Sequence, residues 1–136
     1  QVYNELKYLK PKLTILTVDI SEDILLPQNY INNILRNLIT NSFKYKKEDK
    51  PLNIKILAYK TGQTYKILYR DNGIGIDLIK NKLNIFKKAQ RFHEKSKLSN
   101  GYGLYYTNLY VEKLKGTIQI YSTPGAGTAF KIQIKA

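Results

Sequence analysis

The sequence predicts an α+β domain, a two-layer α/β sandwich in which a mixed, mostly antiparallel sheet packs on about three helices. Two observations favour this class. Apolar residues with helical spacing follow Pro27, and alternating apolar residues fill several short stretches that turn residues connect. Because hairpin turns connect some of these stretches, the sheet cannot be all parallel. A chain of 136 residues with 43% hydrophobic residues is large enough for one domain with its own core.

The first predicted elements are a helix tail, a strand and a long helix. Residues 1–12 have the apolar spacing of a helix end, and we expect them to be the tail of an upstream helical dimerisation segment that precedes a domain at 13–136. Residues 13–20 alternate as a strand does. A helix is expected over 28–47, because its apolar positions follow the spacing of a buried stripe: Ile31, Ile34, Leu35, Leu38 and Ser42.

The remaining elements alternate between the two layers. The predicted order is strands at 52–58 and 65–69, a short helix capped by Asp77, a polar basic loop at 87–100, a helix from Gly103 that ends at Gly116 as its C′ glycine, and strands at 118–120 and 130–134. Each pair of strands is joined by a turn that contains glycine, so each pair is expected to form a hairpin.

Composition excludes several functional classes. The chain has no cysteine, so disulfides and thiolate metal ligands are excluded, and no apolar run approaches the length of a membrane span. The net charge of +13 favours anionic partners. However, Lys and Arg are spread over the whole chain rather than gathered in an arm or an aromatic-basic motif. We therefore expect a lysine-rich surface, with no nucleic-acid binding and no membrane contact by this domain.

A row of asparagines marks one side of the long helix. Asn33, Asn37 and Asn41 are four residues apart and share one helical stripe, and Lys44 and Tyr45 extend it. An amide oxygen suits a Mg²⁺ ion that already carries phosphate oxygens. Lysine can contact phosphate, and a tyrosine ring can pack on a nucleotide. Spacing alone leaves a simple polar helix face as an equal alternative.

Two glycine-containing loops follow. Asp71 ends a predicted strand and precedes Gly73 and Gly75, so its carboxylate could accept hydrogen bonds from the exocyclic amine of adenine. The alternative is an ordinary hairpin turn, but the chain continues into a helix rather than a returning strand. Gly101 and Gly103 stand at the start of the next helix, where backbone N–H groups can hold phosphates or where glycines simply make a flexible joint.

In this order and spacing, the three segments resemble the N, G1 and G2 boxes of the histidine-kinase ATP-binding domain, a member of the GHKL or Bergerat-fold superfamily. Residues 85–91 look like the F box and residues 122–130 like the closing hairpin, so the resemblance covers about 13–134. It implies ATP and Mg²⁺ as ligands and residues 87–100 as the ATP lid. Its implied catalytic residues are Asn37, Asn41, Lys44 and Arg91, with Asn41 as the metal ligand. The implied nucleotide contacts are Asn41, Lys44, Tyr45, Asp71, Gly73, Gly75, Ile76, Phe86, Gly101, Gly103, Leu104 and Thr128.

One position separates the chemistries of the superfamily. Its ATPases carry a glutamate, as a general base for water, where this chain has Asn37, which cannot take a proton at neutral pH. Departures from the family at Ala89, Ser99 and Tyr102 remove no liganding group. The single histidine, His93, falls inside the implied lid and is expected to be a surface residue.

The resemblance therefore implies a protein-histidine kinase domain of a two-component system. It would transfer the γ-phosphate of ATP to a histidine on a separate upstream dimerisation (histidine-phosphotransfer) domain, and a response regulator receiver domain would be the next partner. The parent protein is expected to be a homodimer. The domain is expected to lie in the cytoplasm, whether or not the parent sensor is anchored in a membrane. Two alternatives stay open: a non-catalytic nucleotide-binding or docking module, and a GHKL ATPase that uses another water-activating group.

Overall fold

The computed structural model describes residues 14–78 and 103–136, which form a sheet of five strands with two helices. The elements are β1 (Thr14–Ile20), α2 (Gln28–Lys44), β2 (Leu52–Thr61), β3 (Thr64–Asp71), α4 (Gly103–Lys113), β4 (Gly116–Thr123) and β5 (Gly127–Lys135). The helix tail expected at 1–12 lies outside the described residues, and so does the short helix expected after Asp77, apart from Leu78. The helices of the described part offer no segment long and apolar enough to cross a bilayer.

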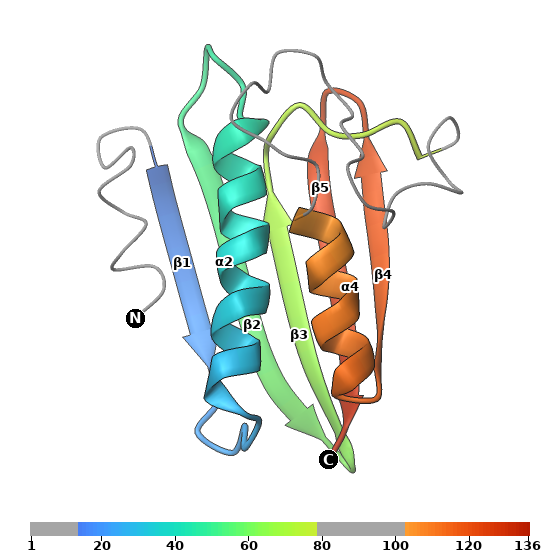
Figure 1. Ribbon diagram of the computed structural model, residues 1–136. Helices are drawn as coiled ribbons and strands as arrows, with labels where there is room; N and C mark the ends of the chain where they lie inside the picture. The colour runs from blue at the N-terminus through green and yellow to red at the C-terminus, as the bar shows by residue number, and fades with distance from the viewer. Residues whose placement is uncertain (1–13, 79–102) are drawn as a thin grey trace.

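The sheet is mixed and mostly antiparallel, as the sequence predicts. Its strand order is β1-β2-β3-β5-β4; β1 pairs with β2 in parallel, and the other three pairs are antiparallel. Helices α2 and α4 lie side by side on one face of the sheet (Figure 1). The rings of Tyr30 on α2 and Tyr110 on α4 are in contact, with their centroids 5.7 Å apart. The fold is thus a two-layer sandwich.

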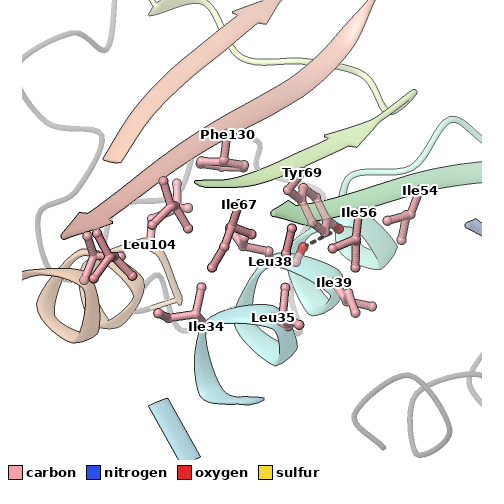
Figure 2. Close-up of a cluster of buried hydrophobic side chains, with 14 of the residues drawn as sticks. Ile34, Leu35, Leu38, Ile39, Ile54, Ile56, Ile67, Tyr69, Leu104 and Phe130 are labelled. Atoms are coloured by element: carbon pink, nitrogen blue, oxygen red, sulfur yellow. Dashed lines mark hydrogen bonds between the residues drawn. The ribbon is translucent and has the colours of Figure 1, made fainter. Parts of the chain in front are cut away.

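The core lies between the helices and the sheet. Alternate residues of the central strands point into it, which follows from the period of two along a strand. In Figure 2, Ile67 and Tyr69 of β3 point toward Leu38 of α2, and Leu104 closes the core from α4. The predicted stripe of α2 is buried at Ile34, Leu35, Leu38 and Ser42, with Ile39 added and Ile31 only partly buried.

Helix ends differ from the sequence expectation at two places. Helix α2 ends at Lys44 rather than near Lys47, because Tyr45 leaves helical geometry with φ −110° and ψ 23°. Helix α4 ends at Lys113, and Lys115, not Gly116, adopts the left-handed conformation with φ 57°. Gly116 instead begins β4, where a Cβ atom would lie 2.6 Å from the carbonyl oxygen of Gln133. Close strand packing, and not a helix cap, explains this glycine.

Candidate functional site

Asp71 ends the central strand β3 on the face that carries the helices, and its carboxylate is held by three donors. Oδ1 accepts hydrogen bonds from the backbone N–H of Gly73 at 2.9 Å and of Thr128 at 3.2 Å. Oδ2 accepts one from the Ser42 hydroxyl at 2.6 Å. The side chain is 9% exposed. Because these donors come from the next loop, β5 and α2, the carboxylate is fixed in one orientation at the point where the three segments meet.

Ser42 links Asp71 to a second buried hydroxyl. The Tyr69 hydroxyl lies 2.5 Å from Ser42 Oγ and 3.0 Å from the carbonyl oxygen of Leu38. Burial raises the pKa of Tyr69 well above its usual value, and the nearby charge of Asp71 raises it further, against the opposing effect of the bond to Ser42. Tyr69 therefore keeps its single proton, which is shared between Ser42 Oγ and the carbonyl oxygen of Leu38, while Ser42 donates to Asp71.

The loop after Asp71 is pinned between the end of α2 and the β4–β5 hairpin. The N–H of Ile74 donates to the carbonyl oxygen of Tyr45 at 2.9 Å, and the carbonyl oxygen of Ile74 accepts from Gly125 at 2.8 Å. Gly75 has φ +77°, and a Cβ atom there would overlap the carbonyl oxygen of Thr123. Only glycine fits this position, so the loop follows a fixed path beside Asp71.

Ser122 anchors the next residue of the loop. Its Oγ accepts from the N–H of Ile76 at 2.7 Å, and it lies 2.8 Å from both the carbonyl oxygen of Gly127 and the hydroxyl of Thr128. Thr128 is the residue whose N–H also reaches Asp71. The hairpin that the sequence predicted as a closing element thus supports the loop and the carboxylate together.

Asn41 lies against the start of α4. A Cβ atom at Gly103 would be 3.1 Å from Asn41 Oδ1 and 3.3 Å from its Nδ2, so the side-chain amide faces the bare backbone there. The Thr107 hydroxyl donates to the carbonyl oxygen of Gly103 at 2.9 Å and fixes the first turn of α4. Since Ser42, the neighbour of Asn41, binds Asp71, one turn of α2 brings all three predicted segments together.

The cationic end of α2 completes the site. Lys44 is half-buried, and desolvation lowers the pKa of its amine. Tyr45 and Asn37 are also half-buried. Lys47 donates from Nζ to the carbonyl oxygen of Gly125 at 2.6 Å, which ties the segment after α2 to the hairpin. Lys44 thus places a positive charge in the last turn of α2.

The sequence profile of the family described as "Histidine kinase-, DNA gyrase B-, and HSP90-like ATPase" matches residues 27–136. The chain belongs to this family.

Sequence relatives of the domain are sensor proteins. It is 33% identical to "Sensor protein RprX" of Bacteroides fragilis over 109 residues, which are 77% of this chain and 21% of that protein. It is 30% identical to "Sensor protein CiaH" of Streptococcus pneumoniae over 118 residues, 85% of this chain and 26% of that protein. The chain thus spans about a quarter or less of the length of these relatives.

Solved structures share the fold. The "Mycobacterial sensor histidine kinase MprB" superposes with a TM-score of 0.79 at 17% identity, covering 98% of this chain and 92% of that one. The predictions of fold and of class, the ATP-binding catalytic domain of a two-component sensor histidine kinase, are therefore confirmed.

The structure brings together most residues that the resemblance assigned to this kinase-type site. On α2 and just after it lie Asn37, Asn41, Lys44 and Tyr45; on the loop and strand ends lie Asp71, Gly73, Gly75, Ile76 and Thr128; at the start of α4 lie Gly103 and Leu104. Phe86, Arg91 and Gly101, with the implied lid at 87–100, fall outside the described residues. The roles of all these residues stay predictions.

Sequence reasoning missed the supporting hydroxyls. Ser42 was assigned to the buried stripe, Tyr69 to a strand and Ser122 to the closing hairpin. A signal was present, because a serine on an apolar stripe needs a buried hydrogen-bond partner. Its partner could not be read from the sequence, since Asp71 is 29 residues away.

Proposed function

We propose that this domain binds Mg²⁺-ATP between α2, the loop after Asp71 and the start of α4, and transfers the γ-phosphate to a histidine of a separate dimerisation domain. The observation that supports this most is the fixed carboxylate of Asp71, which is held by a hydrogen bond from Ser42, the neighbour of Asn41 on α2. The proposal extends to a response regulator receiver domain as the next phosphate acceptor. It also includes a homodimeric parent with this domain, from residue 13 onward, in the cytoplasm.

The hydrogen bonds of Asp71 fit a role toward adenine. An ionised carboxylate can accept about four hydrogen bonds, and three are occupied by Gly73, Thr128 and Ser42. The remaining acceptor position belongs to Oδ2, which accepts from Ser42 alone among residues 14–78 and 103–136. An exocyclic amine can donate there, whereas the carbonyl of guanine would place a second acceptor against it. This arrangement supports a preference for adenine.

Asn41 fits a metal that arrives with the nucleotide. Within residues 14–78 and 103–136, no three His, Cys, Asp or Glu side chains form a group that could hold a metal ion. A Mg²⁺ ion here would therefore depend on phosphate oxygens and water, with the neutral amide oxygen of Asn41 as its protein ligand. When bound, the metal would neutralise charge on the phosphates. Asn41 itself is oriented by α2 and by its contact with Gly103.

The chemistry of α2 favours transfer over hydrolysis. Its sequence, Gln28 to Lys44, contains no Asp or Glu, and Asn37 occupies the position of the superfamily's general base. No carboxylate on this helix can take a proton from water. Lys44 instead supplies a positive charge. Desolvation raises the free energy of the charged amine, so the amine favours the approach of an anion. Positioning and charge stabilisation of this kind suffice for phosphoryl transfer to a histidine nitrogen, with ADP as the leaving group.

The test combines this chain with the purified dimerisation domain of its parent protein and ATP labelled in the γ-phosphate. We expect acid-labile, base-stable label on the histidine of the added domain. Asn41→Ala should abolish transfer. Asn33→Ala is the matched control, because that asparagine lies on the same row but its amide donates to the carbonyl oxygen of Asn29.

The other outcomes identify the alternatives. Steady release of phosphate by this domain alone would indicate an ATPase. Binding of ATP without transfer to any added histidine would indicate a nucleotide-binding or docking module. Equal transfer by Asn41→Ala and Asn33→Ala would remove Asn41 from the mechanism.

A further inference from the structure

The sheet has a second face that neither helix covers. Figure 1 shows α2 and α4 on one side of the sheet only. Along β3, Tyr69 and Asp71 point toward the helices, so Arg70 and Leu68 point to the opposite, open face. The register continues this face into β2 through Lys55 and Leu57. The open face is therefore distinct from the site around Asp71.

A broad hollow of about 490 Å³ lies on this face. Its lining spans all five strands, from Thr17 of β1 to Tyr121 of β4. Part of the lining is apolar: Leu57 and Leu68 are register partners on β2 and β3, and Ala129 and Tyr121 form a second pair on β5 and β4. Leu57 is 39% exposed and Tyr121 is 54% exposed. Large apolar side chains that stay exposed within one hollow indicate an interaction surface.

Positive charge adjoins both apolar pairs, because Arg70 is the register partner of Ala129 and Lys131 is that of Leu68. Lys55, Arg70 and Lys131 line the hollow, against a single carboxylate, that of Asp19 at the β1 edge. Lys55 and Arg70 are direct cross-strand partners. Like charges in that position destabilise a sheet, and in the described part of the chain no ion pair neutralises either one. An anionic occupant would remove this repulsion.

The width and openness of the surface limit the kind of molecule that could bind to it. Five strands spaced about 4.8 Å apart make a face about 19 Å wide, whereas an α-helix with its side chains is about 10–12 Å across. A small molecule would be left mostly exposed on so open a surface. A nucleic acid or the headgroups of a bilayer would set phosphates against Leu57 and Leu68, which line the hollow. A helix with an apolar stripe and acidic flanks matches both parts of the surface.

We propose that the open face of the sheet docks an acidic amphipathic helix of a partner protein. Its apolar side chains would pack on Leu57, Leu68 and Tyr121, and its carboxylates would reach Lys55, Arg70 and Lys131. Tyrosine and arginine are the residue types that contribute most at such interfaces. The proposal is independent of nucleotide chemistry, because the face lies across the sheet from Asp71.

The probe is a synthetic helical peptide of about 18 residues with leucines at i, i+3, i+4 and i+7 spacing and glutamates on both flanks. We expect saturable binding by this chain, with amide NMR shifts on β2, β3 and β5 at the open face. A peptide with the same leucines but lysines on the flanks should bind at least about tenfold more weakly. Anionic vesicles and single-stranded DNA are tested in parallel.

Two pairs of variants separate this surface from general charge attraction. Lys131→Glu should weaken binding about tenfold or more, whereas Lys113→Glu, an equal charge change on the exposed side of α4, should leave it unchanged. Leu57→Ser should weaken binding, whereas Leu25→Ser, at a leucine that is 80% exposed elsewhere, should not. Thermal melting confirms that each variant is folded.

Three results would overturn the proposal. Equal weakening by Lys131→Glu and Lys113→Glu would show attraction to net charge alone. Shifts on α2 or α4 rather than on the open face would place the peptide elsewhere. Binding of vesicles or DNA at the open face, without binding of the acidic peptide, would show that the occupant is not a protein helix.

Discussion

Replacing Asp71 with asparagine separates the role of its carboxylate in the fold from its role toward a purine. The amide oxygen of asparagine can still accept from the N–H groups of Gly73 and Thr128. The amide nitrogen would face Ser42 Oγ, which can accept instead of donating and can turn its proton toward Tyr69. The buried network therefore stays satisfied, and we expect a loss of less than about 1 kcal/mol in the free energy of unfolding.

The effect on nucleotide binding should be larger. The substitution exchanges an anionic acceptor for an N–H donor at the position that faces the exocyclic amine of adenine. A hydrogen bond to a charged group contributes about 1–3 kcal/mol, which corresponds to a loss of about 5–150-fold in affinity for ADP or ATP. The ratio of ATP to GTP affinity should also fall, because the new donor suits the guanine carbonyl.

Isothermal titration calorimetry with ADP, ATP and GTP measures the binding, and urea unfolding measures the fold. Asp19→Asn is the matched control, since that aspartate lies on the open face at the β1 edge and should not affect nucleotide affinity. An unchanged ATP affinity in a folded Asp71→Asn variant would refute the reasoning and remove Asp71 from the purine site.

Three further predictions concern the surroundings of this carboxylate. Tyr69→Phe removes a fully buried hydroxyl with two partners and should lower the free energy of unfolding by about 1–2 kcal/mol in urea; an unchanged midpoint would contradict it. Gly75→Ala should cost at least about 2 kcal/mol, because its φ is +77° and the Cβ meets Thr123, whereas Gly62→Ala, with φ +58° in open space, should cost less. Burial lowers the pKa of Lys44 below the usual 10.5, so the amine loses its charge at a lower pH than an exposed lysine does. ATP affinity should fall as the pH rises through that range, and Lys44→Arg should retain the affinity.

The sequence was sufficient for features that depend on local spacing. The stripe of α2, the alternation of β2 and β3, and the position of Asp71 at a strand end all follow from periods of 3.6 and 2. These features place Asn41 and Asp71 correctly on their elements. The sequence also predicted a mixed sheet, because hairpin turns join its strands.

Features that depend on distant partners could not be predicted in this way. The pairing of Asp71 with Thr128 joins residues that are 57 positions apart, and it decides which N–H reaches the carboxylate. Gly116 has the expected residue type for a helix end, yet tight packing against β5 explains it, and Lys115 takes the left-handed turn. Such choices depend on the packed sheet and not on local preference.

The central position of β3 determines how binding at its end would change hydrogen exchange in the middle of the sheet. Both edges of β3 are fully paired, with β2 on one side and β5 on the other. Its amide hydrogens should therefore exchange with solvent only when the whole domain unfolds. A ligand bound at Asp71 adds its binding free energy to that unfolding. Slower deuterium uptake at Ile67 and Leu68, in the middle of the sheet and away from the ligand, would thus report occupancy of the site.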